Sequence, residues 1–328
     1  MQFSALKNPI YFLLFAIYLL LQTACQPEQI SLPDTGRKIV LNGLINSDSL
    51  IRVYVGKSIY ISDSDGLVVQ NLDNAKVYIY QNGLLIDSLQ HDFKGINWGL
   101  FYPSGNYYSK KVKPLPGKEY RIVAKIPGLP DVSATAILPN PVKIEKVDTA
   151  VIQIVTDRVV IDHKEYTYYQ DALKCNIKFA DPLNETNYYL VEVFYKNYEL
   201  MWPILSERFT CKDPVVEEYL TDGEIAGGNL AGVVFSDKVI NGKTYSLNLT
   251  VWKNPANSGV GVKPREVIYF HLYSISENYF KYIRTLNLYS AKHGKPLSEP
   301  VQVFSNITGG YGIFAGAAAS CDSLVFNN

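Results

Sequence analysis

The chain is 328 residues long and carries 31 basic and 31 acidic residues, so its formal net charge is zero. Partners that are recognised mainly by charge, such as nucleic acids and anionic membrane surfaces, are therefore not expected. The 25 Tyr and 14 Phe residues favour a mainly β protein, because aromatic side chains suit the half-buried surface of a sheet.

The N-terminus has the features of a secretory signal peptide. Lys7 precedes an apolar run, IYFLLFAIYLLL at residues 10–21, whose helical length of roughly 18 Å is short of a membrane's hydrocarbon core. Cys25 follows a Thr-Ala pair as in a lipobox, in which the thiol takes a diacylglycerol, although Gln precedes this pair where the motif has an aliphatic residue. We predict a signal peptide at residues 1–24, a lipid anchor on Cys25 and a polar tether over residues 25–36. The alternative is ordinary secretion with a free thiol at Cys25.

Residues 37–140 have the pattern of short strands separated by turns. Asn82 and Gly83 lie between two apolar runs and predict a hairpin, because a type I′ turn needs positive φ at both positions. The spacing of strands and turns predicts a β-sandwich. The motif Asn-Ala-x-Val-x-Ile-Tyr-x-Asn-Gly (74–83) followed by Pro-Gly-x-x-Tyr (116–120) resembles the immunoglobulin-like or transthyretin-like modules of exported proteins. The Pro-bracketed stretch at 138–148 places a domain boundary after residue 140.

Residues 141–328 are predicted to form a second, β-rich domain that contains one helix. Asn241 and Gly242 predict another hairpin. Ser276 is a candidate N-cap and Gly294 suits the end of a helix, so we expect a helix at about 277–292. Its apolar stripe must be buried, and it consists of Tyr279, Ile283 and Leu286.

The segment SNITGGYGIFAG at 305–316 is unusually rich in glycine. Glycines within a strand pattern mark bulges or a close approach of two backbones. We expect this segment to form a last hairpin packed against the helix, with the glycines facing the apolar stripe. The alternative is an interaction segment that includes Asn306, Gly309, Gly310 and Gly312.

Three cysteines follow Cys25. Cys175 and Cys211 lie in strand-like runs, and in an oxidising compartment they are candidates for a disulfide, which leaves Cys321 as a single thiol. Buried free thiols are the alternative.

No motif for catalysis stands out. The four histidines are not spaced for a helical zinc site, and no G-x-S-x-G sequence occurs, so we predict neither a catalytic residue nor a cofactor. Asp63 and Asp65 resemble the start of a calcium loop without its remaining ligands, and a polar turn is the favoured interpretation. In each adjacent tyrosine pair we expect one ring in the core, because neighbouring strand residues face opposite ways; the pairs begin at Tyr107, Tyr168 and Tyr188.

Several segments in this order resemble a family known as domain of unknown function 4249. They include VLNGLINSDSLIRVYVGKS (40–58), DNAKVYIYQNG (73–83), ETNYYLVEVF (185–194), FSDKVINGKTYSLNLTV (235–251), LYSISENYFKYIRTL (272–286) and LSEPVQVFSNITGGYGIFAG (297–316). The resemblance implies an outer-membrane lipoprotein, facing the periplasm or the surface, that is found alongside TonB-dependent receptors.

We therefore expect a non-enzymatic accessory or binding component of the outer membrane. Its expected contacts are the membrane, through the lipid, and an outer-membrane β-barrel receptor as a possible partner. A structural or adhesive surface protein, or a secreted hydrolase with a dispersed site, are the alternatives.

Overall fold

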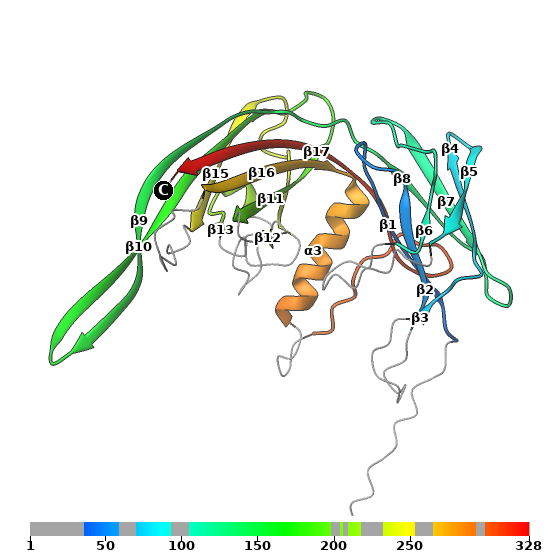
Figure 1. Ribbon diagram of the computed structural model, residues 1–328, viewed down its shortest axis with the longest axis horizontal. Coiled ribbons are helices and arrows are strands. Elements are labelled where there is room, and N and C mark those ends of the chain that lie inside the picture. Colours follow the sequence, from blue (N-terminus) through cyan, green and yellow to red (C-terminus); the bar gives the residue numbers. More distant parts are fainter. Residues whose placement is uncertain are drawn as a thin grey trace, which may run out of the picture. The chain divides into compact units, whose positions relative to one another are not determined.

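The computed structural model shows a mainly β chain, which confirms the predicted fold class (Figure 1). It describes residues 36–58, 70–92, 105–197, 204–205, 209–217, 232–252, 265–292 and 299–327. Cys25, Asp63 and Asp65 lie outside these ranges, so the predictions made for them stay predictions.

The first half of the chain forms a strongly curved set of strands around its own core. These are β1 (Ile39–Ile45), β2 (Arg52–Lys57), β3 (Gln70–Asn71), β4 (Lys76–Gln81), β5 (Leu84–His91), β6 (Tyr107–Tyr108), β7 (Glu119–Lys125) and β8 (Val132–Ile137). Along the sheet the order is β1-β2-β6-β5-β4-β7-β8, with β3 paired to β2. Asn82 and Gly83 turn between β4 and β5 with φ of 49° and 81°, which confirms the predicted hairpin.

The second half supplies the remaining strands and the helices. They are β9 (Ile144–Ile161), β10 (Lys164–Ala180), β11 (Tyr188–Asn197), β12 (Ile204–Leu205), β13 (Phe209–Thr210), α2 (Pro214–Glu217), β14 (Val233–Ser236), β15 (Thr244–Trp252), β16 (Arg265–Ile275), α3 (Glu277–Lys292) and β17 (Tyr311–Asn327). Four strands form a separate sheet in the order β13-β15-β10-β9.

Strand β11 shows how the second half is layered. Tyr189, Val191 and Val193 share a core with residues of the four-stranded sheet. Leu190 points the other way and shares a core with Ile283 of α3. Because successive strand residues face opposite sides, the sheet that contains β11, β16 and β17 is covered by the four-stranded sheet on one face and by α3 on the other (Figure 1).

The helix α3 has the bounds predicted from the sequence. The backbone carbonyl of Ser276 accepts the first hydrogen bonds of the helix, from the amides of Tyr279 and Phe280. The hydroxyl of Ser276 does not cap the helix and instead accepts a hydrogen bond from the amide of Gly316 (3.2 Å). The helix is therefore tied to β17 at its first turn.

The predicted hairpin at Asn241 and Gly242 is wrong. The strand before this turn, β14, pairs with β11, whereas the strand after it, β15, pairs with β10. Gly242 has a φ of 70°, but Asn241 does not have positive φ, so the turn is not type I′. The turn carries the chain from one sheet to the other.

Strand β17 joins the two halves. It pairs in parallel with β1 and antiparallel with β16. Phe314 and Ala318 enter the core of the N-terminal strands, whereas Ile313, Ala315 and Ala317 enter the core beneath α3. The predicted division after residue 140 stays a prediction, with β17 as a strand that both halves share.

Candidate functional site

A row of polar side chains crosses three neighbouring strands on the α3 side of the sheet. Glu192 of β11 lies opposite His271 of β16, and His271 lies opposite Cys321 of β17. Tyr273 is two residues beyond His271 and so shares its face. No short sequence motif predicts this row of side chains, because its members come from three separate strands.

The side chains of this row contact one another in sequence. The Cys321 Sγ lies 3.5 Å from Nε2 of His271, and the Tyr273 hydroxyl lies 3.2 Å from Nδ1 of the same ring. The Tyr273 hydroxyl also hydrogen-bonds to Glu192. A thiol beside an imidazole that is oriented by a third group is the arrangement of a nucleophile and its base.

The electrostatics of the row do not activate the thiol. Burial lowers the pKa of His271, and burial together with the Asp322 carboxylate raises the pKa of Cys321. Burial also raises the pKa of Glu192 to about 7. Reactive cysteines need the opposite shift, because the thiolate is the nucleophile. Burial therefore shifts all three groups toward their neutral forms, and the carboxyl of Glu192 is about half protonated near pH 7.

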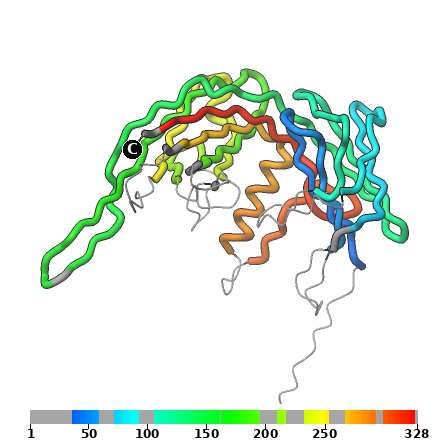
Figure 2. The backbone as a smooth tube through the Cα atoms, in the orientation of Figure 1, coloured from blue at the N-terminus to red at the C-terminus, as the bar shows by residue number. Residues whose placement is uncertain are grey.

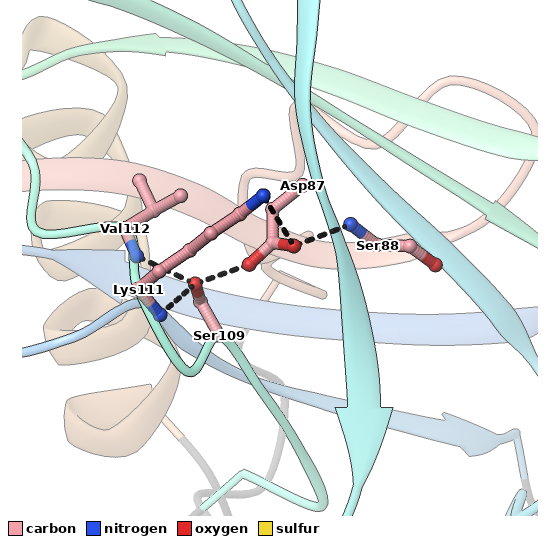
Figure 3. Close-up of polar contacts among 5 residues, drawn as sticks. All are labelled: Asp87, Ser88, Ser109, Lys111 and Val112. Atoms are coloured by element: carbon pink, nitrogen blue, oxygen red, sulfur yellow. Dashed lines mark hydrogen bonds and ion pairs between the residues drawn. The ribbon is translucent and has the colours of Figure 1, made fainter.

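A second polar cluster surrounds Ser109, just after β6 (Figure 3). The Ser109 hydroxyl donates to Oδ2 of Asp87 (2.5 Å) and accepts hydrogen bonds from the amides of Lys111 (3.2 Å) and Val112 (2.8 Å). The Lys111 ammonium lies 3.7 Å from Asp87. A hydroxyl offers one donor and two acceptor positions, and all three are used here. Ser109 is also fully buried, so this Ser–Lys–Asp group stabilises the loop.

The predicted disulfide between Cys175 and Cys211 is corrected by the structure, in which both thiols are free and buried. Cys175 of β10 lies opposite Leu249 of β15, and Cys211 directly follows β13, on the other side of β15. Two strand spacings separate the cysteines by about 9–10 Å, beyond the Cα separation of about 7 Å that a disulfide tolerates.

The glycine-rich segment 305–316 packs tightly, but the predicted last hairpin does not form and the partner of the glycines differs from the expected one. A Cβ on Gly312 would lie 2.1 Å from the carbonyl oxygen of Leu41 in β1, and one on Gly316 would lie 2.4 Å from that of Ile137 in β8. Both glycines face the N-terminal strands. Ile313, which follows Gly312 directly and so points to the opposite side of the strand, faces α3. Successive residues of β17 point to opposite sides of the strand. The glycines therefore approach β1 and β8, and not the helix.

Asn306 holds this segment in place. Its side-chain amide donates to the carbonyl of Phe314 (2.8 Å), and its side-chain oxygen accepts from the Phe314 amide (2.9 Å). The Asn306 side chain thus pairs with β17 as a strand would. Gly309 and Gly310 approach the backbone of Asp131 and Ile39 in the same way. These contacts favour the structural interpretation of the segment.

A run of exposed apolar side chains lies on the hairpin of β9 and β10. From residue 148 to residue 171, a segment we call the β9–β10 arm, no described side chain is buried. The arm extends past the end of β15, whose pairing with β10 stops at Ala172 (Figure 2). Its exposed large hydrophobic side chains are Val151, Val155, Val160, Tyr166, Tyr168 and Tyr169.

Comparison with known proteins places the chain in a family. The model of a domain of unknown function, DUF4249, matches residues 26–321. The chain belongs to the DUF4249 family. No curated protein matches the sequence.

Within this DUF4249 chain, the described residues include no group of three His, Cys, Asp or Glu side chains placed to hold a metal ion. No described helix is long and apolar enough to cross a membrane. The sequence does not predict this exposed arm, because its strands have an ordinary β composition. In the adjacent pairs, Tyr107 and Tyr189 are buried as expected, but Tyr168 and Tyr169 are 52% and 59% exposed.

Proposed function

We propose that this DUF4249 protein is a non-enzymatic component of the outer membrane that is anchored by a lipid on Cys25 and acts by binding another protein. The observation that carries this proposal is the β9–β10 arm. Exposed apolar patches on soluble domains mark interaction sites. A two-stranded ribbon has little stability of its own in water, so a partner that covers the arm would also stabilise it.

Both faces of the arm suit a protein partner. Val155 and Tyr169 lie opposite each other on one face, and Tyr166 and Tyr168 lie on the other. Tyrosine combines an apolar ring with a polar hydroxyl, and it is enriched where proteins meet. The charges of the arm are concentrated toward its tip, where Arg158 is already 3.6 Å from Glu165, whereas residues 149–156 carry none. This uncharged stretch of the arm favours contact with a protein surface.

The resemblance on which the outer-membrane location rests also suggests the partner. A TonB-dependent β-barrel receptor would be held in the same membrane as the lipid anchor. Confinement of both proteins to one membrane raises their effective concentration, so a modest arm surface suffices for association.

The test is affinity capture of the tagged full-length protein from detergent-solubilised outer membrane. The arm variant is Tyr166→Ser/Tyr168→Ser/Tyr169→Ser, and the control is Tyr289→Ser, which removes a tyrosine of similar exposure (41%) on α3. We expect wild type and control to capture a receptor, and the arm variant to lose it while melting at the same temperature. Unchanged capture by the arm variant would show that the arm is not the binding element.

One observation favours a second candidate, a thiol-dependent hydrolase: the 3.5 Å contact between Cys321 and His271. The rate of Cys321 alkylation separates the two. A neutral thiol with a raised pKa reacts slowly with iodoacetamide below about pH 9. Rapid labelling at pH 6 that is lost in His271→Ala would favour the hydrolase.

A further inference from the structure

Strand β9 leaves one long edge unpaired. It is the last strand of the four-stranded sheet, and in the described part of the chain no strand pairs with its outer side. Exposed edges are normally protected by charges, proline or short length, because their free N–H and C=O groups recruit other strands. From Val151 to Val155 this edge carries no charge and no proline. The backbone N–H and C=O groups of this edge are therefore available to pair with another strand.

The sequence of this edge is symmetric. Residues 151–155 read Val-Ile-Gln-Ile-Val, the same in both directions. When two copies of this segment pair antiparallel about a two-fold axis at Gln153, Val151 lies opposite Val155, Ile152 opposite Ile154, and Gln153 opposite itself. A two-fold interface requires such self-complementarity, because each contact occurs twice.

The side chains agree with this register on both faces. Opposed residues of an antiparallel pair share a face, so Val meets Val beside the central Gln pair on one face, and Ile meets Ile on the other. A glutamine amide both donates and accepts, so two Gln153 side chains can hydrogen-bond to each other. At all five positions, therefore, each side chain lies opposite one of the same kind in the second copy.

Charges at the two ends of the segment are also complementary. Asp148 and Arg158 each lie five residues from Gln153, so residues of opposite charge from the two copies come near each other, although within the chain Asp148 already lies 2.6 Å from Lys146 and Arg158 lies 3.6 Å from Glu165. The shift in the β9–β10 pairing between Tyr168 and Tyr169 leaves Thr156 as an extra residue in β9. The regular ladder therefore ends at Val155, and these charges meet within one residue of ideal register.

We infer that β9 of one copy pairs antiparallel with β9 of a second copy, centred on Gln153, and joins their two four-stranded sheets into one. This inference rests on the proposed function, in which the arm binds protein and Cys25 anchors the chain. A ladder of five residues is short, and anchoring of both copies in one membrane supplies the effective concentration that it needs.

Charge-swap variants of the full-length lipoprotein in lipid vesicles test the pairing. Gln153→Lys and Gln153→Glu each place like charges opposite each other on the axis, and we expect self-association to weaken about tenfold in each. Mixing the two variants places Lys opposite Glu, and association should return. Ser290→Lys and Ser290→Glu, at an exposed site on α3, should leave association unchanged.

A disulfide readout reports the register. Under mild oxidation Gln153→Cys should form a covalent dimer, whereas Val160→Cys, farther along β9, should not. A monomeric wild type, or charge variants that both still associate, would overturn the inference. If self-association is absent but the arm still captures a receptor, this inference is wrong and the proposed function stands. If both are absent, both are wrong.

Discussion

At the scale of single residues, Glu192 gives the clearest pH dependence. Burial raises its pKa to about 7, above the ordinary value of 4.5, so the folded protein holds a proton that the unfolded chain releases. The stability this group contributes is complete below about pH 4.5 and is lost as the pH rises through about 7. Between these values the free energy of unfolding should fall by up to about 3 kcal/mol.

Denaturant unfolding of wild type and Glu192→Gln at pH 5 and pH 8 measures this effect. Most of the fall should be present in wild type and missing from Glu192→Gln. His271 has a lowered pKa and contributes the opposite slope below about pH 6.5, but it is common to both proteins and cancels in their difference. Equal pH dependence in the two proteins would show that Glu192 is not buried in the folded state.

Among the glycines that the structure describes, Gly312 combines a positive φ with the shortest approach to a backbone atom. Its φ is 115°, which L side chains rarely adopt, and its Cβ would lie 2.1 Å from the carbonyl oxygen of Leu41. We expect Gly312→Val to destabilise the fold by at least about 3 kcal/mol. Gly128→Val is the control, because Gly128 has a φ of 80° but open space around it. Similar losses in thermal melts would mean that strain alone, without the clash, explains the effect.

Single residues also show which structural features the sequence does not predict. The glycines of 305–316 were predicted to mark a close approach, and they do, but the sequence could not say which strand approaches. The contact of Gly312 with Leu41 joins residues 271 positions apart in the sequence. The row of Glu192, His271 and Cys321 was missed for the same reason, because only the register of three strands brings it together.

At the scale of elements, local signals predict well and pairing partners do not. The helix at 277–292 is correct to the residue, because its spacing of apolar residues and the glycine and proline after it are local features. The Asn82-Gly83 hairpin is correct for the same reason. The turn at Asn241 has the same local sequence, yet it joins strands of different sheets, because burial of β14 beside β11 outweighs turn preference.

The packing of α3 predicts a strong effect at Ile283, whose side chain is 1% exposed. It lies in a core with Leu190 of β11 and Ala315 of β17. Ile283→Asp places an unpaired charge there and should cost roughly 4 kcal/mol or more. Ser290→Asp, on the exposed side of the last helical turns, should cost less than about 1 kcal/mol. If Ile283→Asp melts like wild type and loses only partner binding, this face of α3 is a docking surface instead.

At the scale of the whole molecule, the proposed lipid anchor on Cys25 would determine where the protein acts. Lipidation of Cys25 predicts that Cys25→Ser loses incorporation of labelled palmitate and moves from the membrane fraction to the soluble fraction. The control is Cys321→Ser, which removes the exposed thiol of the body and should change neither result. Retention of label in Cys25→Ser would assign the lipid to another residue.

The proposed function requires that the β9–β10 arm is the part of the molecule that meets a partner. A photo-crosslinking amino acid at Tyr168, in the full-length protein in intact cells, tests this most directly, with the same substitution at Tyr289 on α3 as the control. We expect a covalent adduct, with a receptor or with a second copy, from Tyr168 and none from Tyr289. No adduct from Tyr168, or equal adducts from both positions, would contradict the claim.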